Sequence, residues 1–99
     1  MIRVRYKERN RKRKIGIEGH ANTGPEGNDL VCAGVSTLAL TLTAALDVNG
    51  IKYKSDVKDG YMLVRTIDPD AAPVFNTVMC GIETLRVMYP EAVEVEYVG

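Results

Sequence analysis

One cysteine and the only histidine of this chain stand at a spacing that could form a catalytic pair. Cys32 follows His20 by twelve positions, and the segment between them is rich in glycine and polar residues. Imidazole is the commonest acid–base group in enzymes, and a thiol within its hydrogen-bond reach is the minimal form of an activated nucleophile. The pair therefore predicts an enzyme whose nucleophile is a thiolate.

The residues around Cys32 predict a helix start that would favour an anion. Asp29 is expected to cap the helix, which places Cys32 in its first turn. Unpaired N–H groups and the helix dipole can lower the pKa of a thiol there below about 8.5. Ser36 follows by four positions, shares the helix face and could support the site. Asp29 would oppose a thiolate if it faced the same way, so its first role is structural or orienting.

The same residue types also have ordinary interpretations. A lone cysteine at a helix start is usually a small buried hydrophobe, and a lone histidine is usually a surface residue. Cys80 lies among apolar residues and is expected to be such a buried thiol. A thiol redox protein is a further hypothesis, although the chain has no C-x-x-C motif. The residue types alone leave these alternatives open.

Hydrophobic periodicity predicts seven elements in a single domain, residues 1–99. Strands are predicted where apolar and polar residues alternate. Helices are predicted where apolar residues recur at helical spacing. The Asp59-Gly60 pair is typical of a hairpin turn. We expect strands at 2–7, 14–18, 51–56, 61–67 and 93–97, a turn at 8–12, and helices from Asp29 to about Gly50 and from about Pro73 to Tyr89. The fold class is α+β: a mostly antiparallel five-stranded sheet, with two helices packed on it, in the order β-β-α-β-β-α-β.

The segment between His20 and the expected helix is predicted to be a substrate loop. It has no apolar anchor, so it should close over an extended peptide rather than hold one shape by itself. Its residues are Ala21, Asn22, Thr23, Gly24, Pro25, Glu26, Gly27 and Asn28.

Charge is unevenly distributed although the formal net charge is zero. Eight of the thirteen basic residues lie in the first fourteen positions, whereas the last nine residues contain three glutamates and no base. Two oppositely charged strands could pair, or the basic segment could meet RNA or an acidic partner. The overall balance does not favour nucleic-acid binding, so nucleic acid is not an expected partner.

Composition and residue spacing favour a cytoplasmic protein with no cofactor. No apolar stretch follows the basic N-terminus as in a signal peptide, and the segment 30–46 is expected to be too short to span a membrane. One histidine and two distant cysteines match no metal-site spacing, and no phosphate-loop motif is present. A domain of 99 residues has a modest core, so a homodimer is plausible.

Two stretches of the chain resemble a known family. The run G-H-A-x5-G-x-D-x-V-C-A-x-V-S, from Gly19 to Ser36, resembles the signature of the ribosomal-processing cysteine proteases of bacteria. The stretch 81–91, with its Tyr-Pro ending, is similar to that family's second helix. The order of strands and helices agrees with the family over nearly the whole chain.

The resemblance implies a function and a set of site residues. It implies that His20 and Cys32 form the catalytic dyad, with Gly19, Asp29 and Ser36 at active-site positions. It implies a small homodimer without metal or cofactor that removes the N-terminal extension of a large-subunit ribosomal protein. The alternatives are a non-enzymatic ribosome-associated or RNA-binding module, and a phage-borne protease acting on a capsid or scaffold protein.

Overall fold

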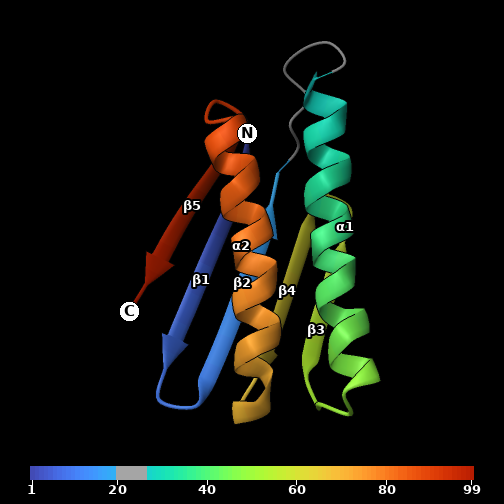
Figure 1. The fold of residues 1–99 in the computed structure, drawn as a ribbon, viewed down its shortest axis with the longest axis vertical. Coiled ribbons are helices and arrows are strands. Elements are labelled where there is room, and N and C mark those ends of the chain that lie inside the picture. The colour runs from blue at the N-terminus through green and yellow to red at the C-terminus, as the bar shows by residue number, and fades with distance from the viewer. Residues whose placement is uncertain (20–26) are drawn as a thin grey trace.

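The computed structural model describes residues 1–19 and 27–99, and only the backbone of residues 27–29. The described elements follow the predicted order (Figure 1). They are β1 (Ile2–Arg9), β2 (Lys12–Glu18), α1 (Gly27–Val48), β3 (Lys54–Lys58), β4 (Tyr61–Thr66), a short 3₁₀ turn (Pro69–Ala71), α2 (Ala72–Met88) and β5 (Val93–Val98). The predicted α+β class is confirmed.

The five strands form one mixed sheet in the order β3-β4-β2-β1-β5. Neighbouring strands are antiparallel except β1 and β5, which run parallel. The basic first strand and the acidic last strand therefore pair, which was one of the two outcomes left open by the charge distribution. Their opposed charges meet across the ladder at Arg3–Glu94 (3.8 Å) and Arg5–Glu96 (3.4 Å).

Both helices cover the same face of the sheet, and the core lies between the two layers (Figure 1). Alternation along each strand sends every second side chain into this core, as at Val4, Ile15 and Val64. Phe75 of α2 and Leu42 of α1 are fully buried against them. No helix of the described part of the chain covers the opposite face of the sheet, which exposes the intervening polar side chains.

The two helices are held close by leucines that pack onto glycines. A Cβ on Gly81 of α2 would lie 2.6 Å from Cδ2 of Leu38, and one on Gly34 of α1 would lie 3.1 Å from Cδ1 of Leu85. Each helix thus offers a gap that a leucine of the other fills. This packing fixes α1, and with it the position of Cys32, relative to α2.

The first hairpin is tighter than predicted. The turn consists of Asn10 and Arg11 alone, with Asn10 at a positive φ of 58°, instead of the whole segment 8–12. Glu8 and Arg13 lie opposite each other in the ladder and form an ion pair of 3.0 Å. A cross-strand pair of this kind extends both strands through residues that look like a polar turn in the sequence.

The chain between α1 and β3 is a loop, so the predicted strand start at Ile51 was wrong. Ile51 is buried, and its N–H bonds to the carbonyl oxygen of Leu46 at the end of the helix. The Thr66 hydroxyl donates to the carbonyl oxygen of Lys52 over 2.7 Å. These bonds tie the helix end to the end of β4, and β3 begins only at Lys54.

Residues Leu30–Val48 of α1 have the length and hydropathy of a membrane span, contrary to the expectation that this segment was too short. One side of the helix is buried in the core through Val31, Val35 and Leu46. Core helices of soluble proteins meet the same length and composition criterion, although only 28% of this window is buried inside the protein.

Candidate active site

Cys32 lies in a groove between α1 and the β3–β4 hairpin. The groove has a volume of about 280 Å³, and Ile2 of β1 and Ile17 of β2 also line it. Cys32 itself is half-buried and packs against the core. Ser36 lines the groove as well, so the two residues share one face of the helix as their spacing predicts. The lining residues that matter below are Gly19, Cys32, Ser36, Leu40, Val57 and Gly60.

The helix begins earlier than predicted, which changes the surroundings of Cys32. Because α1 starts at Gly27, the backbone of Asp29 lies within its first turn rather than before it. Cys32 is then the sixth helical residue, beyond the first four N–H groups that lack a helical partner. The helix dipole also acts mainly within the first turn. The prediction of a first-turn thiol was wrong, so the helix start offers a thiolate at Cys32 less stabilisation than expected.

Gly19 anchors the end of β2 beside the groove. Its N–H donates to the carbonyl oxygen of Gly60 over 2.9 Å, and its φ of +99° lies in the region that favours glycine. A Cβ at this position would overlap the carbonyl oxygen of Met1. The chain therefore leaves β2 at a fixed point beside the groove, immediately before His20.

The predicted histidine and most of the predicted substrate loop lie outside the described residues. These are His20 and residues 21–26. The loop was predicted to extend through Asn28, but the backbone of Gly27 and Asn28 is helical, so this part of the prediction was wrong. A helix that starts two residues earlier shortens the connection between Gly19 and α1.

The opposite wall of the groove comes from a hairpin that the sequence analysis did not assign to the site. Asp59 and Gly60 form the predicted two-residue turn between β3 and β4. Val57 of β3 is 62% exposed and faces the groove, opposite Leu40 of α1, which is 63% exposed. Two apolar side chains that are exposed and line one groove could hold an apolar group of a peptide. The available signal was Val57 itself, the single apolar residue in the otherwise polar strand Lys54–Lys58.

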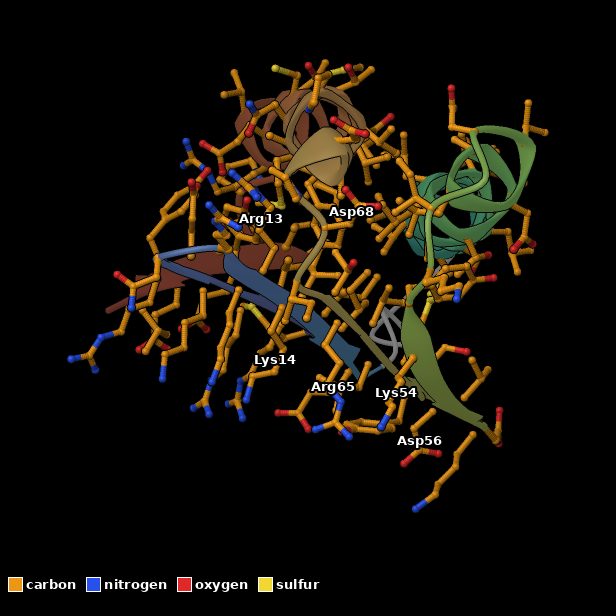
Figure 2. The ribbon with its side chains drawn as sticks, turned by 90° about the horizontal axis from the view of Figure 1, so that it is seen from below. Arg13, Lys14, Lys54, Asp56, Arg65 and Asp68 are labelled. Atoms are coloured by element: carbon orange, nitrogen blue, oxygen red, sulfur yellow. The ribbon has the colours of Figure 1, made fainter. Side chains whose placement is uncertain are left out.

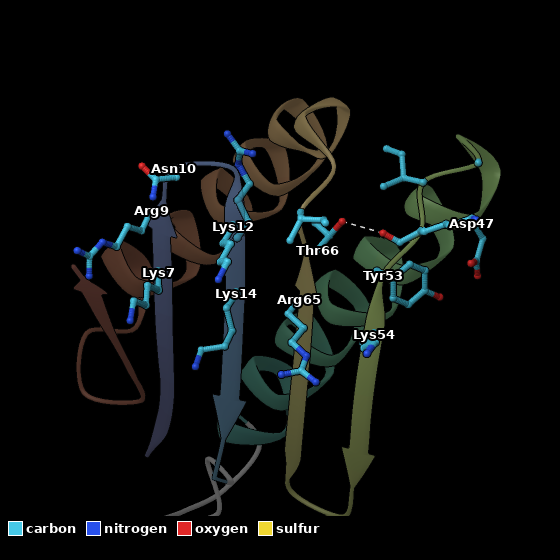
Figure 3. Close-up of a pocket in the computed structure, with 15 residues that line it drawn as sticks. Lys7, Arg9, Asn10, Lys12, Lys14, Asp47, Tyr53, Lys54, Arg65 and Thr66 are labelled. Atoms are coloured by element: carbon cyan, nitrogen blue, oxygen red, sulfur yellow. Dashed lines mark hydrogen bonds between the residues drawn. The ribbon is translucent and has the colours of Figure 1, made fainter.

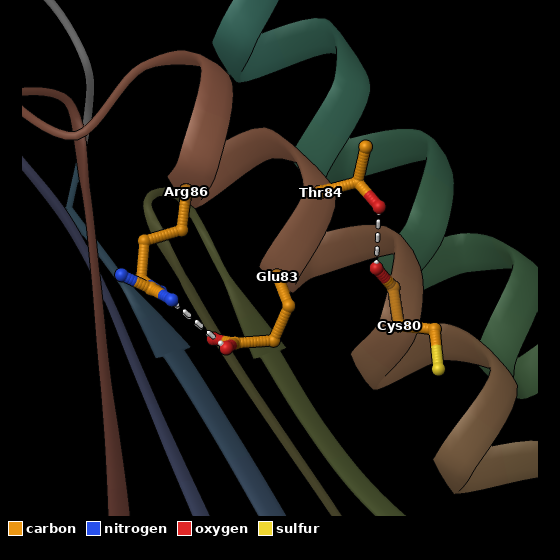
Figure 4. Close-up of polar contacts among 4 residues, drawn as sticks. All are labelled: Cys80, Glu83, Thr84 and Arg86. Atoms are coloured by element: carbon orange, nitrogen blue, oxygen red, sulfur yellow. Dashed lines mark hydrogen bonds and ion pairs between the residues drawn. The ribbon is translucent and has the colours of Figure 1, made fainter.

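Cys80 is exposed on α2 and does not line the groove, so the expectation of a buried thiol was wrong. Figure 4 shows it beside the Arg86–Glu83 ion pair of 3.0 Å, and its carbonyl oxygen accepts a bond from the Thr84 hydroxyl. The buried face of α2 is formed instead by Val78, Met79 and Ile82, so position 80 points outward. Among the described residues, no three histidine, cysteine or carboxylate side chains are grouped to hold a metal ion.

Comparison with solved structures identifies the fold. Two crystal structures of the ribosomal processing protease Prp of Staphylococcus aureus, one with a substrate peptide and one with a covalently linked product peptide, match with TM-scores of 0.83 and 0.81. Each is 24% identical in sequence, and the match covers 99% of this chain and all of theirs.

Sequence comparison extends the likeness from fold to family. The ribosomal processing cysteine protease Prp of S. aureus is 25% identical over 87 residues, which is 82% of each chain. That of Mycoplasma pneumoniae is 26% identical over 85 residues, covering 84% of this chain and 85% of its own. Residues 1–94 match the family model of the cysteine protease Prp. The chain belongs to the Prp family.

Family membership makes this chain a cysteine protease. The two cysteines of this chain differ in their surroundings rather than in access to solvent. Cys32 opens into a groove, whereas Cys80 stands on the outer side of a helix.

Proposed function

We propose that this protease removes the N-terminal extension of a large-subunit ribosomal protein, with Cys32 as nucleophile and His20 as acid–base group. The position of Cys32 in the groove, with Gly19 at its edge immediately before His20, is the observation that carries the proposal. The names of the relatives, which are ribosomal processing proteases, support the class of substrate.

The chemistry would proceed through an acyl-enzyme. His20 takes the proton of the Cys32 thiol, and the thiolate attacks the carbonyl carbon of the scissile peptide bond. The C–N bond breaks, and His20 returns the proton to the leaving amine. Water, deprotonated by His20, then attacks the thioester; the N-terminal extension leaves as a carboxylic acid, and the Cys32 sulfur takes the proton back from His20.

Two further groups of the chain would assist. Backbone N–H groups in the first turn of α1, which starts at Gly27, lack helical partners and could stabilise the oxyanion. Ser36 could bind a polar group of the peptide from one turn along the helix. Asp29 keeps an orienting role in the proposal, because a carboxylate close to the thiolate would oppose its charge.

An apolar substrate side chain would lie between Leu40 and Val57. These residues come from α1 and β3, so the peptide would contact both walls of the groove. The part of the predicted substrate loop that precedes the helix, residues 21–26, would then cover the peptide from the side of His20. This assignment places recognition on the hairpin as well as on the loop.

The experiment is cleavage of an N-terminally extended large-subunit ribosomal protein, followed by mass spectrometry. Wild type and Cys80→Ala should release one N-terminal fragment, and Cys32→Ala should release none. His20→Ala should be slower by roughly 10²–10⁴-fold. Normal processing by Cys32→Ala, or loss of processing in a folded Cys80→Ala protein, would refute the assignment.

A homodimer in the cytoplasm completes the proposal. Exposed apolar residues on the helices, such as Leu30 (66%) and Val87 (70%), could contribute to an interface. Light scattering of the purified chain would give the mass of a dimer, and a monomer mass at high micromolar concentration would contradict it.

A further inference from the structure

Four cations form a continuous row across the helix-free face of the sheet. The register places Lys7 opposite Lys14, Lys14 opposite Arg65, and Arg65 opposite Lys54. The row therefore crosses β1, β2, β4 and β3 and spans about 14 Å, since neighbouring strands lie about 4.8 Å apart. Figures 2 and 3 show Lys14, Arg65 and Lys54 extending from the same face.

The charge of this row is not neutralised within the described chain. No ion pair involves Lys7, Lys14, Arg65 or Lys54 in residues 1–19 and 27–99. At the other end of the same face Arg3 and Arg5 are paired with Glu94 and Glu96. Although the net charge of the chain is zero, this face of the sheet has one end where opposite charges are paired and another end that is cationic.

Stability of the sheet does not explain such a row. Like charges directly opposite each other destabilise a β-ladder, and this row contains three such pairs. Arg9 and Lys12 form a fourth pair beside it, at the β1–β2 turn. A surface that weakens the fold in this way is expected to bind something that offsets the repulsion.

The shape of the surface favours an extended partner. These six cations line an open hollow of about 1520 Å³, too large for a single small anion (Figure 3). Among the lining residues Asp47 is the one carboxylate, and it lies at the α1 rim. We propose that this basic face, formed by Lys7, Arg9, Lys12, Lys14, Lys54 and Arg65, binds the phosphate backbone of RNA.

An acidic peptide fits the surface less well. Peptides commonly bind a sheet by adding a strand to an edge, where backbone groups are unpaired. Three of the four strands under the row, β1, β2 and β4, are interior strands with neighbours on both sides. Only side chains are therefore available over most of the surface, and lysine ammonium groups suit repeated phosphates.

The basic face and the cysteine groove are separate. Cys32 lies on the helix side of the sheet near the start of β1, whereas the row lies on the other side, beyond the middle of β1. Bound RNA would leave the groove open. RNA binding follows from the charge row alone; the choice of RNA over DNA rests on the proposed ribosomal substrate.

The test measures binding of a fluorescein-labelled 20-nucleotide uridine RNA to the Cys32→Ala chain by anisotropy. With each of the four cations of the row neutralising one phosphate, the logarithm of the association constant should fall with the logarithm of the salt concentration with a slope of about −2.8. That slope corresponds to a loss of about 50-fold between 50 and 200 mM salt. The double variant Lys14→Gln, Arg65→Gln should halve the slope.

Matched controls separate this surface from general attraction. The double variant Arg3→Gln, Arg5→Gln removes two cations of the same face that already have carboxylate partners, and its slope should equal that of the parent chain. A DNA 20-mer and a polyglutamate of equal length should bind no more tightly than the RNA. Equal loss in both double variants, tighter binding of DNA or polyglutamate, or no RNA binding at 50 mM salt would overturn the proposal.

Discussion

The amide of Gly19 donates a hydrogen bond to the carbonyl oxygen of Gly60 over 2.9 Å, and this bond joins the end of β2 to the β3–β4 turn. Both residues line the groove that contains Cys32. The bond therefore fixes the point at which the chain turns toward His20 relative to the wall of the groove. A substitution at either glycine should therefore alter the groove although the new side chain does not contact Cys32.

Gly19→Ala tests this relationship. The new methyl group would meet the Met1 backbone, and alanine is strained at a φ of +99°, so we expect a destabilisation of about 2–4 kcal/mol. Urea unfolding measures the loss, and peptide cleavage should fall with it. Gly50→Ala is the matched control: its φ is +67°, but its Cβ would meet open space, so the expected cost is about 1 kcal/mol. Equal costs would refute the steric account.

Gly81→Ala should destabilise the contact between the helices. The gain in helix propensity is about 1 kcal/mol, whereas forcing Leu38 away costs about 1–3 kcal/mol, so a net loss is expected. Gly34→Ala, whose Cβ would lie 3.1 Å from Leu85, should be nearly neutral. In a Leu38→Ala background Gly81→Ala should become stabilising. Denaturation of the full mutant cycle gives the coupling energy, and a value near zero would contradict this packing.

Val57→Ala should raise the KM for a cleaved peptide by roughly 10-fold with little change in kcat, because part of an apolar contact of about 1–2 kcal/mol is lost. Val48→Ala removes the same group from a more exposed position on α1, which does not line the groove. Steady-state kinetics of both variants measure the effect, and the KM of Val48→Ala should equal that of the wild type. Unchanged KM in Val57→Ala would place substrate recognition elsewhere.

The less exposed thiol of the chain should react faster with an alkylating reagent than the more exposed one. Cys80 is exposed and Cys32 half-buried, yet iodoacetamide at pH 6.5 should modify Cys32 first if His20 takes its proton. Mass spectrometry of timed samples gives the two rates. His20→Ala should slow modification of Cys32 and leave Cys80 unaffected. Faster modification of Cys80 in the wild-type chain would argue against an activated Cys32.

Alkaline pH should weaken the core at Tyr6. Burial raises the pKa of this tyrosine above its ordinary value of 10.0, and the Glu8 carboxylate adds to the shift. The folded state therefore favours the neutral hydroxyl. Its contribution is complete below about pH 10 and is lost as the pH rises through the higher pKa of the folded state. In urea titrations at pH 8 and 10.5, Tyr6→Phe should lose less stability than wild type. An equal loss of stability in both proteins would show that ionisation of Tyr6 is not the cause of the alkaline destabilisation.

Local patterns were enough to predict the elements but not their partners. The Asp59-Gly60 turn, the alternation of β1 and the Tyr89-Pro90 helix end are short-range signals, and the structure contains all three. The parallel pairing of β1 with β5 joins segments at opposite ends of the described chain. No local pattern specifies such a pairing, and the row of cations depends on another long-range pairing, that of β2 with β4.

The site was only partly visible in the sequence for the same reason. Cys32 and Gly19 fall within one contiguous motif, whereas Val57 reaches the groove from a different hairpin. The helix start was misplaced because Asp29 is a good capping residue, yet the helix already begins at Gly27. Cys80 was assigned to the core because its neighbours are apolar, although the helical period turns position 80 outward.

The parallel ladder between β1 and β5 also bears on how the protein is made. Of the described strands β1 leaves the ribosome first and β5 last, yet the two are neighbours in the sheet. β1 has its full set of hydrogen bonds only after nearly all of the described chain has been synthesised. The nascent chain therefore cannot complete its sheet before β5 has left the ribosome, and proteolytic activity should arise only after that point.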